Sequence, residues 1–261
     1  LIWQADPAFW NRHAPVLFPN VGKYYGGHFT YNGKAYPMGQ HGFARDTEFE
    51  QIAAGEDFVT YRLCADEESK KKYPFDFVLE ITHRLENNRL SVEWNVKNVD
   101  DKEMYFTIGG HPAFNVNILP DTDFEDYSLV FKEGIETLSY ILIDAENGTA
   151  LTDKTHKLEL TNSKYALKKD MFDKDALIFD NGQIEWVGLA LPNGKPYIAL
   201  ESKNFPNFGI WSKPGAPYVC LEPWCGRCDN KGFQGEISEK PGINTLKAGE
   251  VFKKSYDIIV Y

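Results

Sequence analysis

Two of the six histidines lie in sequence settings that suit chemistry. His41 precedes Gly42, and a glycine lets the backbone approach a ligand closely. His111 follows the expected strand Tyr105–Ile108, so it lies at a strand end, where loops commonly carry functional residues. Arg45 adds a planar donor fork near His41 that suits vicinal hydroxyls or a phosphate. A histidine held by a turn carbonyl would explain either position equally well, so both interpretations stay open.

Two acidic residues are further candidates. Glu222 follows the apolar run Tyr218–Leu221 and precedes a proline and a tryptophan. Desolvation there would raise the pKa of its carboxyl group toward the range of a general base. The alternative is an exposed glutamate on an edge strand, paired with Arg227. Asp180 precedes Asn181-Gly182, and an aspartate of a turn is its default interpretation.

The cysteines have no clear role. The run Cys225-Gly-Arg-Cys228 looks like a thioredoxin redox motif, but that chemistry needs a helix N-terminus in a βαβ unit, and this region is rich in strands. Cys220 would add a third thiol for zinc, but it should alternate along a strand with Glu222, and no second pair of ligands follows. No glycine loop for phosphate is present. We therefore expect no metal and no cofactor.

Period-two alternation predicts the elements that must position these residues. Runs 75–81 and 90–96 alternate apolar with polar residues around a turn at 86–89, and run 187–191 should pair with run 197–201 around Asn193-Gly194. Further short strands are expected at Gly26–Tyr31, Tyr105–Ile108, Ser128–Phe131, Lys157–Leu160, Phe208–Trp211, Tyr218–Leu221 and Tyr256–Tyr261. A helical turn is expected near Lys168–Phe172, and the charged run Asp66–Lys72 is expected to be a solvated loop. Many short strands with few helical signals predict an all-β sandwich or barrel.

Composition narrows the class of protein. The 261 residues are 43% hydrophobic, which suffices for one large core, and no break in composition divides the chain, so we expect a single domain over 1–261. The net charge of −10 argues against nucleic acid as a partner. No apolar run approaches the roughly 20 residues that span a bilayer, and no signal peptide is visible. Four cysteines are too few for a disulfide scaffold. We expect a cytoplasmic protein that acts away from membranes.

Several ordered motifs resemble the aldose 1-epimerases (galactose mutarotases), in particular their LacX-type branch. The motifs are Trp3-Gln-Ala-Asp-Pro7, Pro15-Val-Leu-Phe-Pro-Asn-Val-Gly22, Gln40-His-Gly-Phe-Ala-Arg45, Gly110-His-Pro-Ala-Phe-Asn115, Leu221-Glu-Pro-Trp224 and, more weakly, Leu246-Lys-Ala-Gly-Glu250. They run in family order over nearly the whole chain. The resemblance implies a β-supersandwich of two large, mostly antiparallel sheets, with the family's first N-terminal strands absent. The start at Leu1 agrees with a missing native N-terminus.

The resemblance also implies roles for single residues. Glu222 matches the family's general base and His111 its general acid. His41 matches the histidine that binds sugar hydroxyls, and Arg45 follows it in this branch. Asp180 falls where the family places an aspartate that binds a ring hydroxyl. Mutarotases of the galactose type carry His-Thr-Tyr where this chain has His-Pro-Ala from position 111, so their sugar preference does not carry over directly.

The resemblance implies interconversion of the α and β anomers of an aldose by acid–base ring opening, without a cofactor or metal. The expected partner is a small sugar, a hexose. Arg45 and Lys23 leave a phosphorylated hexose possible as well. The expected oligomeric state is a monomer or homodimer. One alternative is a carbohydrate-binding protein without catalysis. Another is a glycoside hydrolase or lyase, which fits less well because such enzymes usually use two carboxylates.

Overall fold

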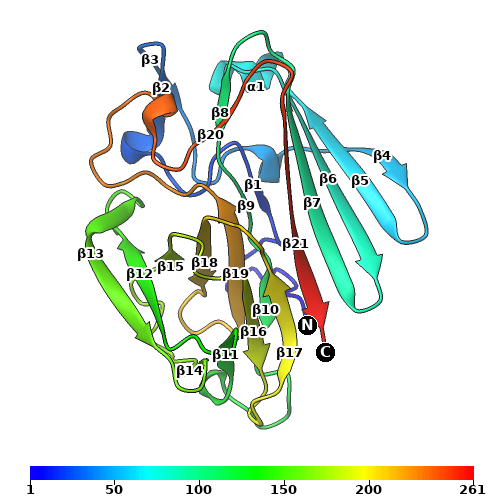
Figure 1. Ribbon diagram of the computed structural model, residues 1–261, viewed down its shortest axis with the longest axis vertical. Coiled ribbons are helices and arrows are strands. Elements are labelled where there is room, and N and C mark those ends of the chain that lie inside the picture. The colour runs from blue at the N-terminus through cyan, green and yellow to red at the C-terminus, as the bar shows by residue number, and fades with distance from the viewer.

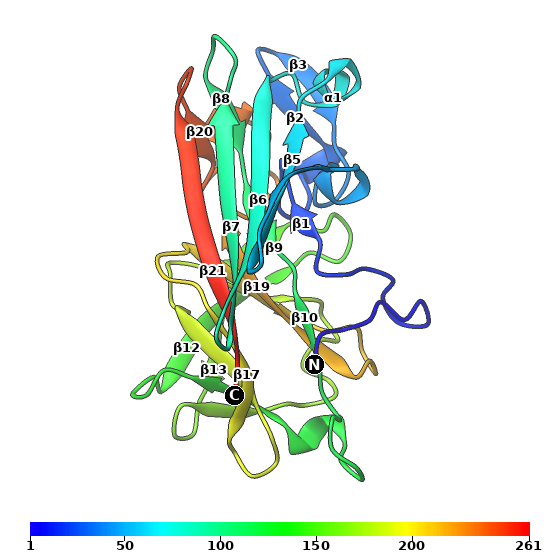
Figure 2. The ribbon, with the colours of Figure 1, turned by 90° about the vertical axis from the view of Figure 1, so that its right-hand side faces the viewer.

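Two large β-sheets make up most of the protein in the computed structural model, which describes all 261 residues (Figures 1 and 2). The first sheet runs in the order β1 (Val16–Leu17), β9 (Ile108–Gly110), β19 (Tyr218–Cys225), β18 (Asn207–Trp211), β15 (Leu177–Phe179), β12 (Thr137–Ile143) and β13 (Ala150–Glu159), with β10 (Ala113–Asn115) also on β19. The second runs β14 (Lys164–Ala166), β11 (Ser128–Phe131), β16 (Trp186–Ala190), β17 (Pro196–Glu201), β21 (Val251–Val260), β7 (Arg89–Asn98), β6 (Phe77–Glu86), β5 (Phe58–Cys64) and β4 (Glu50–Ala54).

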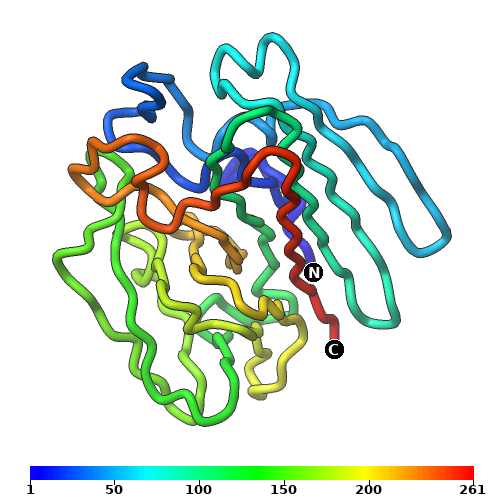
Figure 3. The backbone as a smooth tube through the Cα atoms, turned by 45° about the horizontal axis from the view of Figure 1, so that its top comes forward, coloured from blue at the N-terminus to red at the C-terminus, as the bar shows by residue number.

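Two short ribbons complete the strands: β2 (His28–Tyr31) with β3 (Lys34–Pro37), and β8 (Met104–Phe106) with β20 (Asn244–Leu246). The neighbours in both large sheets pair antiparallel, for example β6 with β7 and β18 with β19. The expected all-β fold with two large antiparallel sheets is therefore confirmed. The two chain ends lie on the same side of the molecule (Figures 1 and 3).

The main hydrophobic core draws on both sheets. Its 45 buried residues include Val92, Trp94 and Val96 of β7, which are the apolar positions of the alternating run, and Leu221 of β19. Successive residues of a strand point to opposite faces, so this alternation buries one face of β7 and leaves the other to solvent. Packing of Leu221 in this core thus holds β19, the strand that carries Glu222, in place.

The two predicted hairpins are confirmed. β6 and β7 pair from Phe77 with Asn98 to Glu86 with Arg89, and Asn87 has the left-handed φ of 53° that this turn needs. β16 and β17 pair around a turn in which Gly194 has a φ of 80°.

Two local predictions were wrong. The charged run expected to be a loop forms α1 (Glu67–Lys72), an exposed helix that Asp66 caps by accepting from the N–H of Ser69 at 2.7 Å. The helical turn expected near Lys168–Phe172 is instead a series of single turns, with the N–H of Met171 bonded to the carbonyl of Lys168. The remaining helices are 3₁₀ turns at Tyr25–Gly27, Ala44–Asp46, Phe124–Asp126 and Ile237–Glu239. None of the helices is long and apolar enough to cross a membrane.

Candidate active site

The site forms where one strand ladder is interrupted. β19 pairs on one side with β18, and on the other side first with β10 and then with β9. His111 and Pro112 lie in the gap between β9 and β10, and the carbonyl of Pro112 accepts from the N–H of Leu221 at 3.1 Å. Alternate residues of a strand direct their N–H groups to the same side. Pro223 is two residues after Leu221 and has no N–H, so β19 has no donor facing the gap at this position. Two prolines therefore open the ladder beside Glu222.

Glycines on both neighbouring strands make room for the indole of Trp224. A Cβ on Gly109 of β9 would lie 2.4 Å from Trp224 Cδ1, and a Cβ on Gly209 of β18 would lie 2.3 Å from Cζ2. Trp224 and Glu222 are two residues apart on β19, so their side chains share one face of the sheet. The glycines thereby allow a flat aromatic ring to lie on the sheet beside the carboxylate.

His111 and Glu222 meet in the interior. Nε2 of His111 lies 3.4 Å from Oε2 of Glu222, and the two residues are only 7% and 2% exposed. Trp10 stacks on the imidazole with ring centroids 4.6 Å apart, and Trp211 contacts it edge-on at 5.9 Å. The two indoles fix the ring beside the carboxylate and keep solvent from that side of it.

Burial opposes charge on both members of this pair. It raises the pKa of Glu222 well above 4.5, and the nearby carboxylate of Asp175 adds to the rise while Trp224 opposes it. It lowers the pKa of His111 to about 3, and the positive charge of Arg45 also lowers it, against a rise from the backbone. Both shifts favour the neutral forms, which are a protonated carboxyl group on Glu222 and an unprotonated imidazole on His111. The alternative of an exposed Glu222 paired with Arg227 is wrong.

Backbone contacts set the orientation of His41. Its own N–H donates to the carbonyl of Gly22 at 2.8 Å, and its Nδ1 accepts from the N–H of Gly22 at 3.0 Å. Because Nδ1 is the acceptor, a neutral ring carries its proton on Nε2, which lies 3.3 Å from the side-chain amide of Gln40 at the cavity wall and can donate to a ligand there. Burial lowers the pKa of His41 well below 6.5, and the charges of His111 and Arg45 lower it further. His41 is therefore a neutral donor, with its ring 5.6 Å from that of His111.

A cavity of about 360 Å³ brings most of the predicted residues together. Its lining includes His41, Arg45, His111 and Glu222, together with Gln40, Lys23, Asp144, Asp175, Trp10, Trp211 and Trp224. Aromatic walls with a few charged and polar groups are typical of a small-molecule site. Trp224 lines this cavity, whereas Phe114 is buried in the main core and lines a different cavity.

Two cations face this cavity. Nη2 of Arg45 donates to the carbonyl of Gln40 at 2.8 Å, while its buried Nε has no hydrogen-bond partner and lies 3.7 Å from Oδ2 of Asp46 in an ion pair. Lys23 forms no ion pair, and its side chain packs where a Cβ on Gly148 would lie 2.7 Å from its Cδ. Both cations can therefore still bind an acceptor on a ligand.

The structure does not bring Asp180 into the cavity. Its Oδ1 accepts from Nε of Arg227 at 3.0 Å and from Nδ2 of Asn207 at 2.7 Å, so its carboxylate already has partners. Asp175 lines the cavity instead and raises the pKa of Glu222. Sequence reasoning missed Asp175 because it lies in a turn between motifs, and its φ of 73°, typical of Asn or Asp rather than other residues, is not visible from the sequence.

The cysteine pair Cys225 and Cys228 is buried, and neither residue forms a disulfide bond. Burial raises the pKa of Cys225 to about 12 and raises that of Cys228. A redox cysteine needs a lowered pKa, so these thiols do not have the setting of a thioredoxin site.

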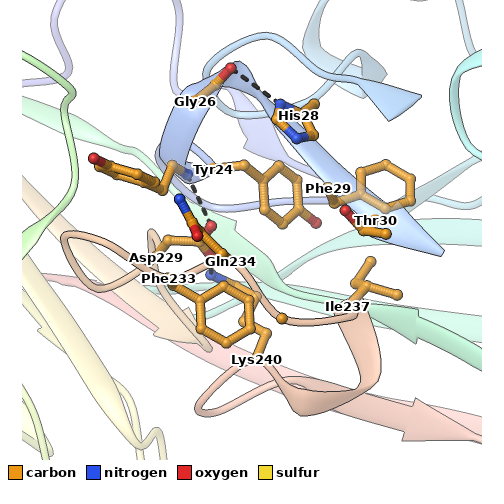
Figure 4. A pocket seen from close by; sticks show the side chains of 12 residues that line it. Tyr24, Gly26, His28, Phe29, Thr30, Asp229, Phe233, Gln234, Ile237 and Lys240 are labelled. Atoms are coloured by element: carbon orange, nitrogen blue, oxygen red, sulfur yellow. Dashed lines mark hydrogen bonds and ion pairs between the residues drawn. The ribbon is translucent and has the colours of Figure 1, made fainter. Parts of the chain in front are cut away.

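Two other cavities lack the predicted acid–base residues. One of about 250 Å³ contains Tyr24 and the buried ion pair between Asp229 and Lys240 (Figure 4). Another of about 420 Å³ lies among the apolar residues of β6, β7 and β21 and touches only Arg45 of the predicted set. The acid–base pair thus singles out the cavity at His111.

The fold and this buried histidine–carboxylate pair define a sandwich protein with a small-molecule pocket on its first sheet. The sequence profile of the aldose 1-epimerase family matches residues 1–258. The chain is 32% identical over 267 residues to protein LacX of Lactococcus lactis subsp. lactis, in both its plasmid and chromosomal forms, covering 99% of this chain and 89% of each relative.

Solved structures agree with this match. A galactose mutarotase related enzyme from Lactobacillus acidophilus superposes with a TM-score of 0.93 at 35% identity, over 100% of this chain and 86% of that one. A galactose mutarotase-like protein from Lactobacillus casei gives 0.88 at 32% identity, over 100% and 89%. The chain belongs to the aldose 1-epimerase family.

Proposed function

We propose that this protein interconverts the α and β anomers of an aldose sugar. The observation that carries the proposal is the 3.4 Å approach of His111 Nε2 to Glu222 Oε2 at a cavity large enough for a hexose. Opening the ring requires a base for the C1 hydroxyl and an acid for the ring oxygen, and these two oxygens are bonded to the same carbon. Two groups close together can therefore serve both.

The reaction starts from the charged form of the pair, in which Glu222 is ionised and His111 is protonated, and moves one proton in each direction. The Glu222 carboxylate removes the proton of the C1 hydroxyl, the oxygen's electron pair forms the aldehyde C=O, and the bond from C1 to the ring oxygen breaks. The protonated imidazole of His111 gives its proton to the departing ring oxygen. The open-chain aldehyde rotates about the C1–C2 bond, and the reverse transfers close the ring on the other face. Each positioned acid or base typically contributes about 10²–10⁴-fold.

Burial favours the opening step. Opening converts the charged pair into a neutral carboxylic acid and a neutral imidazole, which is the distribution that the pKa directions of Glu222 and His111 favour. A buried carboxylate is a stronger base, and a buried imidazolium is a stronger acid, than either group in water. The state with the ring open is thus the one in which both groups have the neutral forms that burial favours.

The remaining polar groups of the cavity would hold the sugar in place. His41 donates through Nε2, and Arg45 and Lys23 offer further donors. Asp175 offers an acceptor, so a sugar hydroxyl can be bound either as an acceptor or as a donor. Fixing the hydroxyls at C2 to C4 confines motion to C1 and the ring oxygen.

Polarimetry tests the proposal. The purified protein should speed the change in optical rotation of freshly dissolved α-galactose or α-glucose, and Glu222→Gln should lose at least about two orders of magnitude in rate while still binding sugar by calorimetry. Asp180→Asn is the matched control, since it neutralises a carboxylate outside the cavity. Binding without any acceleration by the unmodified protein would instead identify a carbohydrate-binding protein.

A phosphorylated hexose is a second candidate substrate, favoured by the absence of an ion pair on Lys23 at the cavity wall. A phosphate would bring the negative charge that this lysine lacks. In that case glucose 6-phosphate should be converted with a lower KM than glucose, and Lys23→Met should remove the difference. Equal KM values for both sugars would exclude this candidate.

A further inference from the structure

A thiol lies next to the acid–base pair and has no part in the proposed reaction. Cys220 precedes Glu222 by two residues on β19, so the two side chains share one face of the strand. Across the sheet Cys220 pairs with Ala113, two residues after His111. One ligand atom each from His111, Cys220 and Glu222 lies within 4.8 Å of the other two.

These three atoms approximate one face of a tetrahedron. Two ligands bound to zinc at about 2.0 Å in tetrahedral geometry are about 3.3 Å apart. Nε2 of His111 and Oε2 of Glu222 are 3.4 Å apart, and no hydrogen bond joins them. Zinc–sulfur bonds are longer, about 2.3 Å, so the thiol of Cys220 needs less movement to reach a shared centre than an oxygen or nitrogen would.

The hydrogen bonding of the imidazole also leaves its nitrogens available. His111 is 7% exposed, yet its Nδ1 is buried without a hydrogen-bond partner. A buried polar atom without a partner costs free energy, and buried imidazoles usually avoid this by bonding both nitrogens. The ring is held by stacking on Trp10, and no hydrogen bond occupies Nε2, so the nitrogen that faces Glu222 is free to accept a metal.

We propose that His111, Cys220 and Glu222 form a zinc site that shuts off the acid–base pair. Nitrogen, thiolate and carboxylate together are ligands that zinc takes, and three protein ligands leave a fourth position open. His111 and Glu222 line the cavity, so the metal enters by the route of the sugar and its fourth position faces the cavity.

Binding of zinc removes the groups that the reaction needs. The metal takes the lone pairs of His111 and Glu222, and the protons of the thiol and of the pair leave to solvent. A metal-bound imidazole has no proton to give to the ring oxygen, and a metal-bound carboxylate is a poor base. Zinc is thus a reversible inhibitor here; the inhibition rests on the proposed epimerase activity, whereas the metal site does not.

Cobalt binding tests the site without reference to activity. The full chain is freed of metal with EDTA and titrated with Co²⁺, whose bond to a thiolate gives a charge-transfer band in the near ultraviolet. One Co²⁺ per chain should bind with this band, and Cys220→Ala should lose it. Cys64→Ala, which removes the exposed thiol, is the matched control and should keep it. Persistence of the band in Cys220→Ala, or a chain without any band, overturns the proposal.

Zinc inhibition tests the consequence. Zn²⁺ should suppress anomer exchange in the unmodified protein, and EDTA should restore it. Cys220→Ala should keep its metal-free rate within about twofold, yet should need at least about tenfold more Zn²⁺ for half-inhibition, because even outer-shell partners of a metal cost 10–100-fold in affinity. Thermal unfolding of the metal-free variant shows that it is folded. Equal zinc sensitivity of the variant and the unmodified protein refutes the site.

Discussion

Replacement of Gly209 by alanine should disturb the site through Trp224. The added Cβ would lie 2.3 Å from Cζ2 and 2.4 Å from Cη2 of the indole. Optimal carbon–carbon contact needs about 3.5 Å, so the ring must move by about 1.2 Å. It has little space to do so, because its other edge lies over Gly109 of β9. A Cβ placed on Gly109 would lie only 2.4 Å from Cδ1 of the indole.

The expected cost follows from this overlap. Overpacking of a well-packed interior costs about 1–3 kcal/mol, and Gly209→Ala should lower the free energy of unfolding by that amount in a denaturant titration. Glu222 is paired with Gly209 across the strands, so the carboxylate should shift with the indole. Because a misplacement of about 1 Å can cost about 10²-fold, anomer exchange should fall by a similar factor.

Gly39→Ala is the matched control for this substitution. A Cβ at Gly39 has no atom within 4 Å, and its backbone is not in the left-handed region. The control should change the free energy of unfolding by no more than about 0.5 kcal/mol. If Gly209→Ala is as stable and as active as this control, the indole does not occupy the place assigned to it.

Three further outcomes are expected. Asp175→Asn should raise KM for the sugar and lower the pKa of Glu222, whereas Asp180→Asn should leave KM unchanged; the opposite result in steady-state polarimetry would restore Asp180 to the site. Burial lowers the pKa of His83 below 6.5, so the unfolded chain takes up a proton more readily than the folded one, and stability should fall as the pH drops below about 6.5. His83→Gln should make that decline shallower in urea titrations at several pH values. Asp66→Ala should lower stability by about 1 kcal/mol through loss of the α1 cap, and no change in the urea midpoint would contradict the cap.

The strands were the most predictable part of the fold. The alternation through 90–96 identified the buried face of β7, and Asn87 supplied the turn that joins it to β6. The helix α1 was missed because it has no apolar stripe. A signal was nevertheless present: a capping aspartate, two glutamates in the first turn and three lysines in the last turn complement the helix dipole.

The site was predictable in part. The apolar surroundings of Glu222 indicated desolvation, but its near-complete burial depends on β9, β10 and β18, which come from distant parts of the sequence. Asp180 was predicted because the family resemblance places a sugar-binding aspartate at that position, yet its neighbour in space is Arg227. Asp175 and Trp10 reach the cavity through loop conformations, and no local pattern of residues encodes such a path.

A double-mutant cycle on His111→Gln and Glu222→Gln, measured as the rate of anomer exchange by polarimetry, tests the central claim most directly. If the two groups act as a unit across 3.4 Å, each single variant should lose at least about two orders of magnitude, and the double variant should lose little more than the worse single one. Single variants with near-normal rates, or two losses that multiply fully in the double variant, would contradict a coupled acid–base pair.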